Sequence, residues 1–311
     1  MTVPIAFLFP GQGSQAVGMG KDLYDGFAVA REVFTEADTV LNFPLSRLCF
    51  DGPSDELTLT ANTQPALLTA SWALTRVLAA EFQLRPSWTA GHSLGEFSAL
   101  VAAGALHFAD ALHVVRERGR AMQTAVAPGV GGMAAVIGLD LPAITAVCQQ
   151  ASEGQVVSPA NLNGGGQIVI AGHREAVERA ATRAQERGAK RVVPLAVSAP
   201  FHCALMAPAA ARLREVLEPI PVSPLHCPVI SNVEAQPNTD PAMVKELLVR
   251  QVVSPVRWQE CVESLARLGC RAAIEVGPGR VLSGLVRRIA RDIRCVAGED
   301  LDAVRTLSEP E

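Results

Sequence analysis

The sequence predicts an α/β protein in which helices flank a mainly parallel sheet and a small α+β subdomain is inserted into the chain. Along most of the 311 residues, apolar runs of strand length alternate with segments of helical periodicity. One serine between two glycines stands at a strand-to-helix junction, and the order of elements changes between residues 128 and 200. The composition, 49% hydrophobic and 19% charged, is typical of a chain that folds around a large core.

The first part of the chain begins with a strand and continues mainly as helices. The apolar run IAFLF at 5–9 predicts a buried strand that ends at Pro10. Two helical patterns follow over about 55–82, and the short apolar piece SWTA then leads into the turn at Ser93. GEFSALVAAGAL, a run of small residues, predicts a helix that packs closely on the sheet, and residues 108–126 predict a further amphipathic helix.

The middle of the chain has its own order of elements. GGMAAVIGL predicts a strand, PAITAVCQQAS a helix, QVVSPANLN and QIVIAG two strands, REAVERAATRAQERG a helix and KRVVPLAVS a strand. This order, β-α-β-β-α-β, is the ferredoxin-like pattern. Strand-helix alternation then returns with PVISNV, helices over about 240–268, RAAIEVG, the helix VLSGLVRRIA and RCVAGE. We therefore expect a small subdomain of residues 128–200 inside a large domain made of residues 1–127 and 201–311.

Composition and charge exclude several classes of function. A net charge of −4 gives no global attraction to nucleic acid, and no apolar run reaches the roughly 20 residues that a membrane span needs. The N-terminus has no basic region or small-residue cleavage site of a signal peptide. The seven cysteines include no C-x-x-C pair, so we expect reduced thiols in a cytoplasmic protein. The histidines form no metal-binding motif, so we expect no metal site.

The turn Gly91-His92-Ser93-Leu94-Gly95 has the G-x-S-x-G pattern of a nucleophilic serine. Its glycines allow a sharp turn, and the serine hydroxyl stands at a helix N-terminus. The backbone N–H of Leu94 is then placed to stabilise an oxyanion. The alternative is a helix-capping serine between packing glycines. The strand-turn-helix context favours the nucleophile.

A serine nucleophile needs a base, and His202 in SAPFHCALM is the better candidate. His92 adjoins Ser93, but neighbours on a tight turn usually point apart. A hydrolase triad would add an acid between serine and histidine, and that stretch offers mainly glutamates on a charged helix. A serine–histidine dyad oriented by another group fits better. The glycine loop Gly11-x-Gly13 resembles a dinucleotide fingerprint, but the region after it has helical spacing instead of the required second strand.

Taken together, the segments resemble the malonyl-CoA:acyl-carrier-protein transacylase family, which includes the acyltransferase domains of fatty-acid and polyketide synthases. The resemblance covers nearly the whole chain and rests on FPGQGSQ, GHSLGEFSALVAAG, RERGRAMQ, VSPANLN, APFHCALM, RQVVSPVRW and EVGPG. It implies a hydrolase-like α/β core with an inserted ferredoxin-like subdomain. It also implies malonyl-CoA as substrate, an acyl carrier protein with a phosphopantetheine thiol as partner, and no bound cofactor.

The resemblance assigns the catalytic groups. Ser93 would be the nucleophile and His202 its base, and the Gln251 position would orient the imidazole through its backbone carbonyl. The backbone N–H groups of Gln12 and Leu94 would form the oxyanion hole. In this family the acyl group passes to serine with loss of coenzyme A and then to the carrier thiol.

The resemblance also assigns substrate-binding residues. Arg118 would hold the free malonyl carboxylate, because a planar guanidinium grips a carboxylate through two parallel hydrogen bonds. Asn161 and Ser198 fall in matching segments and would line the pocket. The sequence departs from the commoner family pattern at Phe97, at Phe201 and in NGGGQ after Asn161, without removing a catalytic group.

Carrier proteins are usually acidic, so the family resemblance also implies a basic docking surface. Two clusters are candidates: Lys190 with Arg191, and Arg287 with Arg288. Solvated helix faces are the alternative for both clusters.

Three functions stay open from the residues alone: an acyltransferase, a serine hydrolase or thioesterase, and a non-catalytic binding subunit of a synthase. A hydrolase has no need of Arg118, and intact Ser93 and His202 argue against a non-catalytic subunit. The sequence does not distinguish fatty-acid synthesis from a trans-acting acyltransferase of a polyketide synthase. It also leaves open the tolerance for methylmalonyl groups and the oligomeric state.

Overall fold

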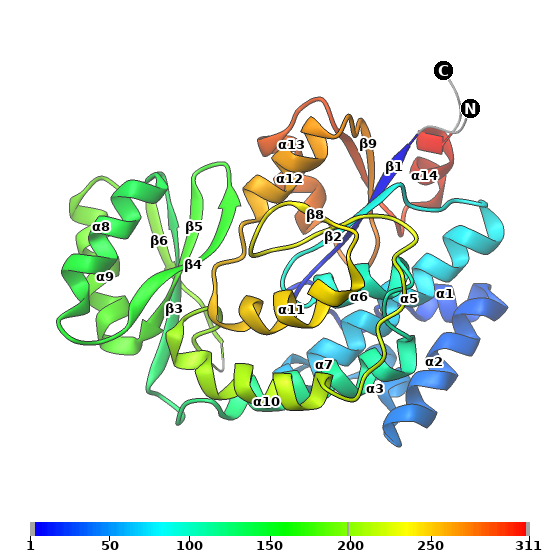
Figure 1. Cartoon of the computed structure of the whole chain (residues 1–311), viewed down its shortest axis with the longest axis horizontal. Coiled ribbons are helices and arrows are strands. Elements are labelled where there is room, and N and C mark those ends of the chain that lie inside the picture. The colour runs from blue at the N-terminus through cyan, green and yellow to red at the C-terminus, as the bar shows by residue number, and fades with distance from the viewer. Residues whose placement is uncertain (1–3, 198, 309–311) are drawn as a thin grey trace.

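Two sheets organise the protein into a larger and a smaller lobe (Figure 1), in a computed structural model that describes residues 4–197 and 199–308. Within these residues, one sheet has six strands in the order β10-β9-β1-β2-β7-β8, and the other has four in the order β4-β5-β3-β6. The strands are β1 (Ile5–Phe9), β2 (Trp88–Gly91), β3 (Gly131–Ile137), β4 (Val157–Gly164), β5 (Gln167–His173), β6 (Arg191–Pro194), β7 (Val229–Ile230), β8 (Pro237–Asn238), β9 (Ala272–Glu275) and β10 (Arg294–Ala297).

Helices cover both faces of the large sheet, and two further helices, α8 and α9, belong to the smaller lobe. The helices are α1 (Lys21–Gly26), α2 (Ala28–Leu41), α3 (Leu45–Asp51), α4 (Ser54–Thr58), α5 (Thr60–Glu81), α6 (Gly95–Ala102), α7 (Phe108–Thr124), α8 (Leu141–Ser152), α9 (Arg174–Glu186), α10 (Ala207–Leu217), α11 (Val244–Val253), α12 (Trp258–Arg267), α13 (Val281–Ile289) and α14 (Leu301–Ser308), with short 3-10 helices η1 (Ala204–Met206) and η2 (Pro241–Met243).

The large sheet is parallel from β10 to β7, and β8 is antiparallel to β7. Successive side chains of β1 point to opposite faces. Phe7 and Phe9 therefore enter the apolar core on one side, whereas Ala6 and Leu8 enter the second core under α12 and α13. Burial on both faces explains why this strand is a continuous apolar run. The carboxyl ends of β1 and β2 meet at one edge of the sheet, where the Ser93 turn lies.

The small lobe, drawn in green in Figure 1, is an antiparallel sheet with α8 and α9 packed on one face. Its strand order β4-β5-β3-β6 and the two crossover helices are those of the ferredoxin-like arrangement. The predicted fold class is thus confirmed: a mainly parallel α/β sheet with a separate α+β lobe inserted between its strands. The division of the chain at residues 128 and 200 stays a prediction.

Some elements differ from the sequence prediction. The strand predicted over KRVVPLAVS ends at Pro194, because Val197 donates its backbone N–H to the Leu195 oxygen two residues earlier (3.0 Å) and the chain turns out of the ladder. The helices α1, α3, α10 and α14, the short helix η1 and the strand β8 are additional to the predicted elements. In the part of the chain that the structure describes, no helix has the length and apolar character needed to cross a membrane.

Candidate active site

The turn that carries Ser93 joins β2 to α6 at the carboxyl edge of the large sheet. Ser93 has a φ of +53°, in the left-handed region that residues with a Cβ rarely adopt. Close packing requires the flanking glycines: a Cβ on Gly91 would lie 1.9 Å from the Gly95 carbonyl carbon, and one on Gly95 would lie 2.0 Å from the Phe9 oxygen. The turn is therefore pressed against the end of β1, with the serine at its centre.

The structure brings Ser93, His202 and Gln251 together from three separate segments. His202 Nε2 lies 2.7 Å from Ser93 Oγ, and His202 Nδ1 lies 2.9 Å from the Gln251 backbone oxygen. A carbonyl oxygen only accepts hydrogen bonds, so Nδ1 carries the proton and Nε2 is free to accept one from the serine. The dyad is thus oriented by a backbone carbonyl instead of a carboxylate.

His202 lies in an environment that keeps its imidazole neutral. The side chain is 3% exposed. Burial, together with the positive charge of Arg118, lowers the pKa of His202 to about 3. A neutral imidazole is the form that accepts a proton, so the histidine is available as a base at neutral pH.

Arg118, on α7, points a buried guanidinium at the dyad. It is 2% exposed, and Nη2 donates to Ser93 Oγ (3.2 Å) and to Gln251 Oε1 (2.8 Å). Nη1 donates to Gln64 Oε1 (2.8 Å), while Nε has no partner among the described residues. Burial lowers the pKa of Arg118 to about 10, so the group is still a cation at neutral pH. The described residues give it no ion-pair partner, which suits the binding of an anionic group.

The two backbone N–H groups expected in the oxyanion hole are free to donate. Neither Gln12 nor Leu94 donates its backbone N–H to another described residue. Leu94 follows the nucleophile directly, and Gln12 lies in the loop after β1. The Gln12 side chain is tied to α5 through a hydrogen bond from Nε2 to Thr60 Oγ1 (3.2 Å). This bond ties the loop to the helix that also carries Gln64, the hydrogen-bond partner of Arg118.

Sequence reasoning missed two polar residues that hold this arrangement. Gln64 supports Arg118, and Asn232 accepts the Ser93 backbone N–H through Oδ1 (2.8 Å) while it donates Nδ2 to the Gly91 oxygen (2.7 Å). Both side chains are almost fully buried. Their sequence positions gave a signal: Gln64 directly precedes the helical run PALLTASWAL, and Asn232 directly follows the strand pattern of PVIS.

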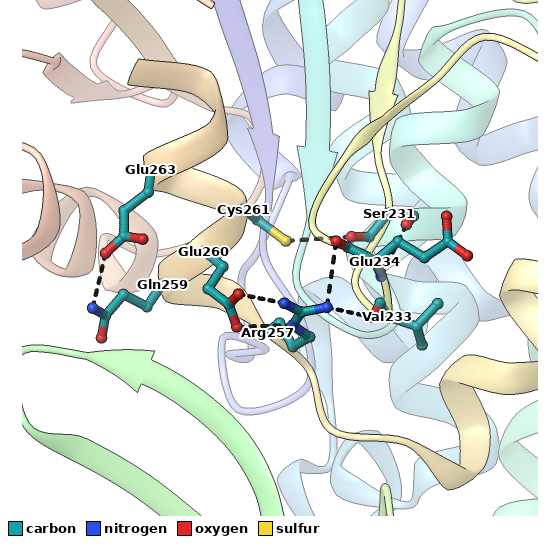
Figure 2. A network of polar contacts seen from close by, with 8 residues as sticks. All are labelled: Ser231, Val233, Glu234, Arg257, Gln259, Glu260, Cys261 and Glu263. Atoms are coloured by element: carbon teal, nitrogen blue, oxygen red, sulfur yellow. Dashed lines mark hydrogen bonds and ion pairs between the residues drawn. The ribbon is translucent and has the colours of Figure 1, made fainter. Parts of the chain in front are cut away.

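A second polar network, shown in Figure 2, fixes the loop that carries Asn232. Arg257 donates Nη1 to the Val233 oxygen (3.1 Å) and pairs through Nε and Nη2 with the Glu260 carboxylate. The Arg257 backbone N–H donates to the Asn232 oxygen itself (3.1 Å). Arg257, at the start of α12, therefore fixes the loop that carries Asn232, whose side-chain amide binds the Ser93 backbone N–H.

Asn161 and Ser198 are the other candidates for lining the pocket. Asn161 lies on β4 and forms a parallel bridge with Val256, and no described hydrogen bond joins its side chain to the dyad. Ser198 lies outside the described residues. The ring of His92 turns away from Ser93, as expected, and its Nε2 lies 2.9 Å from Asn163 Oδ1 in the small lobe.

The basic residues expected to dock the carrier are all exposed. They are Lys190, Arg191, Arg287 and Arg288. Within the described residues, no three histidine, cysteine or acidic side chains are grouped so as to hold a metal ion.

Comparison with known proteins gives full-length matches. Residues 6–301 match the family described as the acyl transferase domain. The malonyl CoA-acyl carrier protein transacylase of Bacillus subtilis (strain 168) is 50% identical over 310 residues, 98% of each chain. The enzyme of the same name from Escherichia coli (strain K12) is 48% identical over 304 residues, again 98% of each chain.

Solved structures agree with these matches. The acyl carrier protein S-malonyltransferase of Vibrio cholerae superposes with a TM-score of 0.94 at 50% identity, over 96% of this chain and 99% of that one. A malonyl-transacylase solved in complex with its type II PKS acyl-carrier protein superposes with a TM-score of 0.95 at 46% identity, over 98% of this chain and 99% of that one.

Proposed function

Because the chain belongs to the family of malonyl-CoA:acyl-carrier-protein transacylases, we propose that it works through a malonyl ester on Ser93. The enzyme is an acyltransferase that moves the malonyl group of malonyl-CoA to the thiol of an acyl carrier protein. The observation that carries the residue assignment is the environment of Ser93 Oγ, which has His202 Nε2 at 2.7 Å and Arg118 Nη2 at 3.2 Å. One hydroxyl thus faces both a base and a fixed positive charge.

In the first half-reaction, Ser93 Oγ attacks the thioester carbonyl carbon of malonyl-CoA while His202 Nε2 takes the serine proton. The tetrahedral oxyanion is stabilised by the N–H groups of Gln12 and Leu94. The C–S bond then breaks, and His202 returns the proton to the departing coenzyme A thiolate. Arg118 holds the distal carboxylate of the malonyl group throughout. Coenzyme A leaves as the free thiol, and the malonyl group stays on Ser93 as an ester.

The second half-reaction runs the same chemistry with the carrier thiol. His202 takes the proton of the phosphopantetheine thiol, whose sulfur attacks the ester carbonyl. The C–O bond to Ser93 breaks, and His202 protonates the serine oxygen. The products are the malonyl thioester of the carrier and the free enzyme. Malonyl-CoA is consumed in the first half-reaction, so it is a substrate and not a bound cofactor.

Mass spectrometry of the intact protein after brief exposure to malonyl-CoA tests this assignment. We expect one malonyl group per chain, located on the peptide that contains Ser93, and its loss on addition of carrier protein with a phosphopantetheine thiol. Release of the group mainly as free malonate, with the carrier present, would favour a hydrolase. An adduct on a different residue would refute the role of Ser93.

We also propose that the enzyme works in the cytoplasm. Its seven cysteines are free thiols, six of them buried, which suits a reducing compartment.

The first prediction concerns the pH dependence of acylation. Burial and Arg118 lower the pKa of His202 to about 3, below the ordinary value of 6.5. The base of the free enzyme therefore stays unprotonated as the pH falls through 6.5 and is lost only near the lowered pKa. We expect kcat/KM for acetyl-CoA, which lacks a distal carboxylate, to stay flat between about pH 5.5 and 8. An inflection near pH 6.5 in stopped-flow acylation would show that His202 titrates as an exposed imidazole.

One residue of each basic cluster expected to dock the carrier, Arg288 and Lys190, lies near the same turn. The Cβ position of Gly165, in the β4–β5 turn, lies 3.2 Å from Arg288 Cδ on α13. On the other side of this turn the Gly166 oxygen accepts the Gly138 N–H (2.9 Å), and the Gly138 Cβ position lies 2.7 Å from Lys190 Cγ. One cluster from each lobe thus borders the same turn, which supports a continuous docking surface for an acidic carrier.

The second prediction tests that surface. The paired charge reversal Lys190→Glu with Arg288→Glu is expected to raise KM for the carrier roughly 5- to 30-fold, since two rim contacts contribute about 0.5–1 kcal/mol each. Self-acylation by malonyl-CoA should stay unchanged, and the defect should shrink at high salt. Arg85→Glu is the matched control, because this exposed arginine precedes β2 and belongs to neither cluster. Equal loss in both half-reactions would contradict the docking role.

A further inference from the structure

Glu96 is a buried carboxylate that the mechanism above does not use. It lies in the first turn of α6, three residues after the nucleophile, and is 2% exposed. None of the ion pairs formed by the described residues involves it. A buried carboxylate is costly, so its position beside an active site calls for a functional explanation.

The hydrogen bonds of Glu96 lead to the residues around the dyad. Oε2 accepts Gln251 Nε2 at 2.7 Å and the Asn232 backbone N–H at 3.2 Å. Gln251 Nε2 also donates to the Ser93 backbone oxygen (2.9 Å). On the opposite side of the same amide, Gln251 Oε1 accepts Arg118 Nη2 at 2.8 Å. One side-chain amide therefore stands between a carboxylate and a guanidinium.

The chemistry of these two neighbours fixes the orientation of that amide. An ionised carboxylate only accepts hydrogen bonds, and a guanidinium only donates them. The NH₂ group of Gln251 must then face Glu96, and its oxygen must face Arg118. The reverse orientation would set two donors against each other at Arg118 and two acceptors against each other at Glu96. The negative charge of Glu96 thus reinforces the direction of the amide, which the Ser93 oxygen and Arg118 also favour.

We propose that Glu96 is a positioning residue for malonyl recognition, which fixes the Gln251 amide so that its oxygen holds Arg118 toward Ser93. The inference rests on the proposed function, in which Arg118 binds the malonyl carboxylate. Without an acceptor at position 96, the Gln251 NH₂ group keeps only the Ser93 backbone oxygen (2.9 Å) and the more distant Asn232 Oδ1 (3.4 Å) as acceptors. The amide is then held less firmly, and so is its bond to Arg118. The acetyl group makes no use of Arg118, so its transfer is insensitive to this change.

The protonation of Glu96 gives the proposal a second readout. Burial raises the pKa of Glu96 to about 7. Arg118 faces it from α7 and stays charged, with its pKa lowered to about 10, and Cys261 faces it from α12 and stays neutral, because burial raises its pKa well above 9. His202 and His92 have lowered pKa values and stay uncharged. Glu96 is therefore the group in this set that changes charge between about pH 6 and 8. Its protonated form keeps a carbonyl oxygen but loses the charge that strengthens the hydrogen bond from Gln251.

The experiment measures kcat/KM for Ser93 acylation by malonyl-CoA and acetyl-CoA in Glu96→Met and Glu96→Gln. Glu96→Met removes the acceptor, so the malonyl-to-acetyl preference is expected to fall about tenfold, the effect of one hydrogen bond to a charged group. Acetyl transfer should stay within about twofold of the wild type. Glu96→Gln keeps a carbonyl oxygen without the charge, so its preference should lie between those of the wild type and Glu96→Met and should match that of the wild type with Glu96 protonated. The wild-type preference should decline as the pH falls below 7, whereas that of Glu96→Gln should not.

Two controls separate positioning from loss of stability. Glu275 is a fully buried carboxylate that accepts the backbone N–H groups of Leu282 and Ser283 at the start of α13, so Glu275→Met is a matched substitution away from the dyad. The malonyl-to-acetyl preference of Glu275→Met should equal that of the wild type, even if the substitution lowers the melting temperature. In a Gln251→Met background, Glu96→Met should cause no further loss of preference, since both act through one amide.

Three results would overturn the proposal. They are an equal loss with both thioesters in Glu96→Met, an unchanged preference in Glu96→Met, and additive losses in the double variant. Failure of the wild type to form a malonyl ester on Ser93 would instead refute the proposed function, so the two failures are distinguishable.

Discussion

Replacing Ser93 with alanine is expected to abolish malonyl transfer and leave the fold intact. Among the described residues, this hydroxyl is the nucleophile hydrogen-bonded to His202, and its polar partners His202 and Arg118 belong to the site. Cys203 adjoins the base in sequence, but it is buried, its thiol is directed to the Pro200 oxygen (3.1 Å), and burial raises its pKa to about 11. A thiol held neutral in this way is a poor nucleophile.

The measurement is carrier malonylation together with intact-mass analysis of the enzyme. Ser98→Ala is the matched control: this serine on α6, five residues after Ser93, is buried, and its hydroxyl has no partner among the described residues. It should keep wild-type activity. Substantial transfer by Ser93→Ala, or a malonyl group on Cys203 in that variant, would contradict the assignment.

The fold class could be predicted because both sheets have a clear local pattern. The run IAFLF is apolar at every position since β1 is buried on both faces, and the predicted bounds 5–9 are those observed. The order of elements between 128 and 200 was enough to indicate the small lobe. The end of β6 was missed because a local hydrogen bond between Val197 and Leu195 stops the strand.

Among the site residues, those in short local motifs could be predicted, and those defined by contacts distant in the chain could not. Ser93 and His202 belong to short motifs, and the expected backbone carbonyl of Gln251 lies at 2.9 Å from the imidazole. Gln64 and Glu96 were not predicted, because their sequence neighbourhoods also fit helix packing and a helix N-terminus. Their roles depend on contacts with Arg118 and Gln251, which lie 54 and 155 residues away in the chain. Such contacts exist only in the folded protein.

Arg118→Ala is expected to collapse the preference of the enzyme for malonyl over acetyl groups, mainly by loss of malonyl transfer. The guanidinium is buried, and malonyl supplies a carboxylate that pairs with it, whereas acetyl supplies none. Leaving one member of a buried ion pair unpaired costs about 3–5 kcal/mol, which corresponds to a preference on the order of 10²- to 10⁴-fold. Gln64, Gln251 and Ser93 already accept hydrogen bonds from Arg118 in the free enzyme, so the lower end of this range is expected.

The test is kcat/KM for both thioesters in the wild type, Arg118→Ala and Arg118→Lys. Arg118→Lys should recover only part of the preference, because an ammonium group cannot reproduce the paired N–H groups of a guanidinium. Loss of Arg118 also removes the second cause of the lowered pKa of His202, so acetylation of Arg118→Ala should begin to decline at a higher pH than in the wild type. Arg116→Ala, two residues earlier on α7 and directed to the Leu41 oxygen, is the control that should keep the preference. An unchanged preference in Arg118→Ala would show that another group binds the malonyl carboxylate.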